Sequence, residues 1–248
     1  MARPRRSALD LGGAFTFGGR VPPGLGLLLV LVLVATVGSW VTRDQGWAAL
    51  VPALLFRGQV WRLVSWAFVQ GDPLTLLFGG FMLYSLGQQL ALVWSEGRLV
   101  LTFLGLAAGA SVITVLVALG WPAADAPHLG MWPVVNGLVL CWAMLYPDRQ
   151  VSIWGVLPLT GKTLALLVVF GTILYGLAGG GIVGLGAYVP HFSALALGFV
   201  LMRGGGLPTR RWKLQAREWM AEREFRKRSR HLKVVRKDGK DEPPRWMN

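Results

Sequence analysis

Six apolar stretches, separated by short segments rich in polar residues, glycine or proline, run from residue 24 to residue 202. A helix needs about 20 mostly apolar residues to span the hydrocarbon core of a bilayer. All six stretches come near that length, and the fifth is the shortest. Their bounds are 24–41, 73–94, 99–119, 129–146, 163–177 and 182–202. The pattern predicts an all-α integral membrane protein, a bundle of six transmembrane helices.

Two of the connecting segments have a distinct character. Residues 42–72 are apolar and aromatic, yet they contain proline, glycine and three arginines, which argues against a water-soluble loop. Trp47, Trp61 and Trp66 suit the headgroup level of a membrane, so we expect an interfacial first loop. The run Gly179-Gly180-Gly181 cannot form a stable helix interior and is predicted to separate the last two spans.

The composition and the placement of charge agree with a membrane protein that has basic ends. Hydrophobic residues make up 54% of the 248 residues and charged residues 15%, whereas a soluble domain carries about 25% charged residues. Of the 25 Lys and Arg residues, 15 lie between positions 203 and 245 and four between positions 3 and 20. We therefore divide the chain into a basic N-terminal segment, 1–23, a membrane domain, 24–204, and a basic tail, 205–248.

The loop charges predict the orientation. If the N-terminus lies inside, the inner segments hold 22 basic residues and the outer segments hold three, Arg43, Arg57 and Arg62. The positive-inside rule then places both termini in the cytoplasm. We expect a multi-pass protein of the bacterial inner membrane, whose first helix is retained because no small-residue cleavage site follows it.

Aromatic residues are interspersed among the charged residues of the basic cytoplasmic tail. Trp212, Trp219 and Phe225 are spaced close to one helical face, which predicts an amphipathic helix on the anionic inner leaflet. The alternative is a solvated tail that docks a soluble partner. Nucleic-acid binding is the least favoured reading, since charge alone supports it.

Several short motifs in chain order resemble the rhomboid family of intramembrane serine proteases. Trp61 and Arg62 stand in the segment GQVWRLVS, residues 58–65, and TLLFGG begins at Thr75. The resemblance covers roughly residues 46–204, and it includes six spans, a long interfacial first loop and the inner loop 146–162. It implies a rhomboid-like bundle of six membrane helices.

In active rhomboids a serine in a G-x-S-G motif opens the fourth helix, and a histidine on the sixth helix takes its proton. A serine hydroxyl is a weak nucleophile without such a base, and donors must also meet the developing oxyanion. Here the fourth-helix motif aligns with Gly130-Met131-Trp132-Pro133, followed by Gly137. The serine position holds Trp132, so the resemblance implies a catalytic helix that has lost its nucleophile.

Of the other family positions, one is matched in this sequence and two are replaced. His191 matches the catalytic histidine and lies between Gly186 and Gly198. The family's oxyanion histidine and asparagine on the second helix are replaced by Thr75 and Gly79. A histidine inside a membrane helix is a candidate functional residue by default. We favour a structural role for it, with a hydrogen bond to a backbone carbonyl or to a hydroxyl such as that of Thr75.

No other residue is expected to replace the serine or to hold a cofactor or metal. Cys141 lies nine positions after Trp132, on the opposite helical face and about 13 Å deeper. His128, at the outer surface, and His231, in the tail, are too far from His191 to share a metal. Gly105, Gly109, Gly137 and Gly198 are expected to let helices approach closely.

Two functions follow from the resemblance. The first is a pseudoprotease that binds membrane lipids or transmembrane segments of client proteins without cleaving them. The alternative is a rhomboid-type intramembrane serine endopeptidase with a displaced active site.

Overall fold

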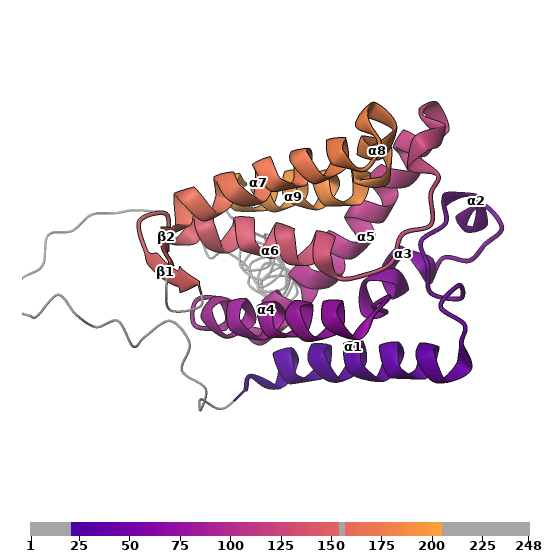
Figure 1. Cartoon of the computed structure of the whole chain (residues 1–248). Helices are drawn as coiled ribbons and strands as arrows, with labels where there is room; N and C mark the ends of the chain where they lie inside the picture. Colours follow the sequence, from indigo (N-terminus) through magenta and orange to yellow (C-terminus); the bar gives the residue numbers. More distant parts are fainter. Residues whose placement is uncertain (1–20, 154–156, 205–248) are drawn as a thin grey trace, which may run out of the picture. The chain divides into compact units, whose positions relative to one another are not determined.

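The computed structural model describes residues 21–153 and 157–204 (Figure 1). The predicted amphipathic helix of the tail lies outside these residues. The longer helices within the described residues are α1 Pro23–Thr42, α4 Pro73–Ala91, α5 Glu96–Gly120, α6 Trp132–Leu145 and α7 Gly161–Ala178. The last span is broken into α8 Gly181–Ala187 and α9 Val189–Arg203. The first loop contains α2 Pro52–Leu55, α3 Arg62–Ser65 and the 3₁₀ turn η1 Trp66–Phe68, and η2 Pro122–Ala124 follows α5.

Each predicted apolar stretch is helical, but not all of them pass as a single span. Helices α1, α5 and α7 are long and apolar enough to cross a bilayer, and α8 with α9 forms a fourth candidate that is bent by 62°. Helix α6 is apolar but has 14 residues. The break between α8 and α9 has a local cause, because Pro190 in the first turn of α9 has no N–H to continue the ladder.

Helix ends follow local chemistry. A proline occupies the first turn of α1, α4, α6 and α9, where its missing N–H costs nothing. The side chain of Asp72 caps α4 by accepting a hydrogen bond from the Thr75 N–H at 2.9 Å. The predicted break after α7 is confirmed: α7 ends at Ala178, and Gly180 and Gly181 have φ values of 135° and 64°. Only glycine adopts such values readily.

The fold is that of an all-α membrane protein, with one short hairpin that the sequence pattern did not predict. Strands β1 Gln150–Ile153 and β2 Leu157–Thr160 form an antiparallel hairpin between α6 and α7, with Gln150 paired to Thr160. The hairpin leads directly into α7. Gly161, the first residue of α7, packs so closely on the carbonyl oxygen of Tyr146 that no side chain fits there.

The core is built around α5, α6 and α9, which pack against each other, while α1 packs on α4 and α5. Helix α6 lies between α4 on one side and α7 and α9 on the other (Figure 1). A methyl group on Gly137 would lie 2.9 Å from the Ala194 carbonyl oxygen, and one on Gly198 would lie 2.8 Å from that of Gly137. The close approach expected of Gly137 and Gly198 is therefore present. Gly109 contacts Leu197, but Gly105 faces open space, so the expectation for Gly105 is wrong.

The first loop is a folded cap rather than an extended strand. Trp47 and Trp61 are 43% and 53% exposed, as a headgroup-level position requires, and the Trp61 Nε1–H donates to the Trp47 carbonyl at 3.2 Å. Trp66 is fully buried, and its Nε1–H donates to the Leu63 carbonyl. The prediction that Trp66 lies at the interface is wrong, because the helical turn around it points the indole into the core.

Arg62 holds this cap together. Its guanidinium donates to the Gly46 and Ala49 carbonyls at 2.5 and 2.6 Å and to the Gln59 Oε1 at 2.6 Å. Arg62 is also buried. The buried charge is tolerated because all three acceptors lie within hydrogen-bond distance.

Candidate functional site

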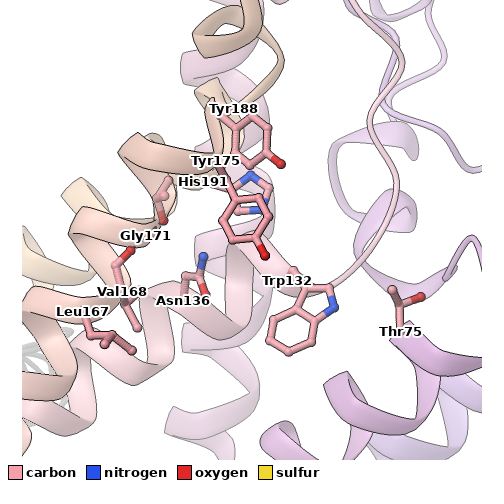
Figure 2. A pocket seen from close by; sticks show the side chains of 10 residues that line it. Thr75, Trp132, Asn136, Leu167, Val168, Gly171, Tyr175, Tyr188 and His191 are labelled. Atoms are coloured by element: carbon pink, nitrogen blue, oxygen red, sulfur yellow. Dashed lines mark hydrogen bonds between the residues drawn. The ribbon is translucent and has the colours of Figure 1, made fainter. Parts of the chain in front are cut away.

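A cavity of about 570 Å³ opens between the N-terminal turns of α4, α6 and α9 and the C-terminal half of α7 (Figure 2). It has an apolar wall and a set of uncharged polar groups. Ten residues line it: Thr75, Trp132, Asn136, Leu167, Val168, Gly171, Thr172, Tyr175, Tyr188 and His191. None of the ten carries a formal charge at neutral pH, so the cavity suits an uncharged guest.

Three positions identified from the rhomboid resemblance meet in this cavity. Thr75, Trp132 and His191 come from three different helices, and all three line it (Figure 2). Gly79, the fourth, does not line the cavity. A methyl group on Gly79 would lie 3.1 Å from the Met131 Cε, so Met131 fills the space beside it. The positions of the rhomboid serine and histidine therefore meet in this cavity. Gly79, at the position of the oxyanion asparagine, is covered by Met131.

The start of α6 is held in place by the first loop. The Met131 N–H donates to the buried Gln70 Oε1 at 3.1 Å, and the Gly130 N–H donates to the Trp66 carbonyl at 2.9 Å. Gly130 has φ 107°, a conformation that favours glycine. These contacts end the loop and begin α6 at Trp132, three residues later than the apolar pattern predicts.

His191 is not anchored as expected. Its Nδ1 is buried and has no hydrogen-bond partner, and its ring lies 4.9 Å from the Tyr188 ring at 32°. The Thr75 hydroxyl donates instead to the Asp72 carbonyl at 2.9 Å and to the Asp72 Oδ2 at 3.1 Å. The predicted hydrogen bond between Thr75 and His191 is therefore wrong, because the Thr75 hydroxyl is bonded to Asp72 at the N-terminal cap of α4.

The cavity hydroxyls do not form a nucleophile and base pair. The Thr172 Oγ1–H donates to the Val168 carbonyl at 2.8 Å, one turn back on α7. Activation of a hydroxyl needs a base within hydrogen-bond distance, and no hydrogen bond joins a threonine to His191 among the described residues. Neither of the two threonine hydroxyls is therefore paired with His191.

Two described groups outside the membrane-spanning segments, Asp72 and His128, have shifted pKa values. The hydrogen bond from the Thr75 backbone N–H holds the pKa of the exposed Asp72 below its ordinary value. Burial lowers the pKa of His128, against smaller opposing effects of the Ala124 carbonyl and Asp125. His128 is buried, and its backbone forms an antiparallel bridge with Leu50 of the first loop.

The remaining motif residues have structural roles. A methyl group on Gly186 would lie 2.6 Å from the Ala123 carbonyl carbon, so this glycine lets α8 pack on η2. Cys141 is buried, with its Sγ 3.7 Å from the Gly198 carbonyl oxygen. No group of three or more His, Cys, Asp or Glu residues that could hold a metal occurs within residues 21–153 and 157–204.

Four polar lining residues escaped the motif comparison. Asn136 lies one turn after Trp132 on the same helix, and Thr172 and Tyr175 face the cavity from α7. Tyr188 stacks on His191. A polar side chain inside an apolar span is itself a signal of a functional or packing role, and that signal marks Asn136 and Thr172 in the sequence.

A family model described as eukaryotic integral membrane protein (DUF1751) matches residues 26–203, from the first turn of α1 to the last residue of α9. No curated protein matches the chain. The matched region contains every element around the cavity.

Proposed function

We propose that this chain, which belongs to the eukaryotic integral membrane protein family DUF1751, is a rhomboid-like pseudoprotease that binds membrane-protein segments or lipid without cleaving them. The observation that carries the proposal is the cavity in which Trp132 and His191 lie together with no activated hydroxyl. The tryptophan at the position of the rhomboid serine, beside a cavity that is still open, supports binding over cleavage.

A guest can reach the cavity sideways from the bilayer. Helix α7 packs on α6 and α8, but among the described residues it makes almost no contact with α4 across the cavity. Two of the α7 side chains that line the cavity, Leu167 and Tyr175, are exposed. Exposed apolar side chains of a membrane helix face lipid. Hydroxyl and amide groups inside the apolar opening would pair with the polar part of an otherwise apolar guest.

The orientation in the membrane is part of the proposal. Arg98, Arg149, Lys162 and Arg203 lie at the end of the bundle where α1 and α7 begin, which favours that end as cytoplasmic. Both termini would then be cytoplasmic. The family description is of eukaryotic proteins, which counts against the bacterial inner membrane expected from the sequence. The proposal is therefore limited to an integral membrane location.

The purified full-length protein is expected to be unreactive toward a fluorophosphonate probe, because no serine stands at the position of Trp132. Trp132→Ser alone should not restore cleavage of a transmembrane substrate. Pro133 removes a backbone donor beside that position, and Thr75 and Gly79 supply neither the histidine nor the asparagine of active rhomboids. In-gel fluorescence and a cleavage assay measure both. Labelling that is lost in His191→Ala would support the displaced-site endopeptidase instead.

A photoreactive residue in place of Leu167 should crosslink to a discrete guest in native membranes. Leu167 lines the cavity and is 56% exposed, while Leu33 on α1 is a matched control that is 51% exposed and lines no part of it. Gly171→Leu should remove the adducts, because Gly171 lines the cavity and has free space for a side chain. Mass spectrometry of the adducts separates protein from lipid guests. Equal adducts from both positions, insensitive to Gly171→Leu, would contradict the proposal.

A further inference from the structure

The two ends of the described helix bundle carry different charge. At the end with the first loop, the basic residues Arg43, Arg57 and Arg62 are matched in number by Asp44, Asp72 and Asp125. The opposite end has four basic residues, Arg98, Arg149, Lys162 and Arg203, and only two acidic residues, Glu96 and Asp148. The charged residues of the described ranges are all at these ends, so one end has an excess of two positive charges.

Three arginines of the basic end lie on mutually packed elements. Arg98 is in the first turn of α5, Arg149 follows α6, and Arg203 is the last residue of α9. Helices α5, α6 and α9 pack pairwise, and these three ends lie on the same side of the bundle (Figure 1). We call Arg98, Arg149 and Arg203 the three-arginine face.

Each arginine of this face is held by an aromatic ring of its own segment. The guanidinium carbon lies 4.9 Å from the Trp94 ring for Arg98, 5.2 Å from the Tyr146 ring for Arg149 and 4.7 Å from the Phe199 ring for Arg203. A guanidinium over a ring face keeps its N–H groups at the edges free. Stacking also restricts the side chain before a ligand arrives, which lowers the entropy cost of binding.

The acidic residues at this end do not neutralise the face. Lys162 Nζ lies 2.8 Å from the Asp148 Oδ1, so these two charges satisfy each other. The Glu96 Oε2 accepts from the Gly24 N–H at 3.4 Å. No ion pair between an acidic residue and Arg98, Arg149 or Arg203 occurs within the described ranges.

We propose that the three-arginine face binds the phosphate of anionic phospholipid headgroups. Guanidinium groups match phosphate oxygens with paired N–H donors, and the helices beneath the face present their apolar sides to the acyl chains of the same lipid. Three preorganised guanidinium groups with no acidic partner among the described residues are complementary to a negatively charged headgroup. The binding is independent of what occupies the cavity between α4 and α7.

The test uses the full chain in phosphatidylcholine nanodiscs titrated with phosphatidylglycerol. Bound lipid is counted by native mass spectrometry, and the thermal unfolding midpoint is recorded. The variant Arg98→Gln/Arg149→Gln/Arg203→Gln is compared with Arg43→Gln/Arg57→Gln, which removes exposed arginines from the opposite end and leaves the tail unchanged. Each near-surface arginine contributes about fivefold in affinity, so the triple variant should lose on the order of 100-fold.

The variants separate stacking from charge and folding from binding. If the triple variant does not fold, Arg203→Gln alone serves as the test, because it changes only the exposed end of α9. It should weaken binding by about fivefold. Phe199→Leu keeps the charge but removes the ring, and it should weaken binding as well. Inorganic phosphate at the same concentration should not raise the unfolding midpoint. Unchanged lipid retention in the arginine variants, equal loss in the opposite-end control, or equal stabilisation by free phosphate would overturn the proposal.

Discussion

Gly137→Ala is expected to lower the free energy of unfolding by about 1–3 kcal/mol, the usual cost of forcing extra atoms into a packed interior. The added methyl group would lie 2.9 Å from the Ala194 carbonyl oxygen and 3.0 Å from the Leu106 Cδ1. Backbone oxygen cannot rotate away as a side chain can, so α6 and α9 must separate. Their separation would also displace Trp132 and His191, which line the cavity from the two helices.

The measurement is the unfolding midpoint of the purified protein in detergent, followed by circular dichroism. Gly105→Ala is the matched control, because nothing lies within 4 Å of the added methyl group. It should leave the midpoint unchanged or raise it, since alanine favours a helix over glycine by about 1 kcal/mol. Equal effects of the two substitutions would show that α6 and α9 do not approach as closely as described.

Arg62→Leu is expected to destabilise the first loop by about 3 kcal/mol or more, because a hydrogen bond to a charged donor contributes about 1.5–3 kcal/mol. The Gly46 and Ala49 carbonyls would lose the donor they share. Arg62→Lys should recover part of the loss, because one ammonium cannot reproduce the planar fork of the guanidinium.

Hydrogen exchange measured by mass spectrometry locates the effect. Exchange should accelerate at Leu50 and His128, whose backbones form a bridge between the first loop and the segment before α6. Arg57→Leu, at an exposed position of the same loop, should leave exchange unchanged. Acceleration confined to residues 46–49 would mean that the cap and the start of α6 are not coupled.

The two predictions address the same property of the site. Two features that shape the cavity, the start of α6 and the packing of α6 on α9, depend on contacts between residues far apart in sequence. The start of α6 depends on Gln70 and Trp66 in the first loop, and the relation of α6 to α9 depends on Gly137 and Gly198. Loss of either support should widen or close the cavity without changing a residue that lines it.

The sequence alone determined where most of the helices lie and where α7 ends. Apolar length placed all six stretches, the predicted second stretch begins at Pro73 as α4 does, and the run Gly179-Gly180-Gly181 marked the break after α7. These features depend on local chemistry, which the residue order contains completely. The resemblance likewise identified Thr75, Trp132 and His191 as positions to examine together, and they line one cavity.

Only the tertiary structure decided which face of each helix is buried and what each polar group contacts. A membrane helix is apolar on every side, so its sequence carries no clear stripe to separate the core side from the lipid side. For this reason Gly105 and Gly109 looked equivalent, although Leu197 packs on Gly109 alone. Trp66 is buried while Trp61 is exposed, and the Thr75 hydroxyl bonds Asp72 and leaves the buried Nδ1 of His191 without a partner. Such outcomes depend on competition between neighbours brought together by folding, which no local pattern records.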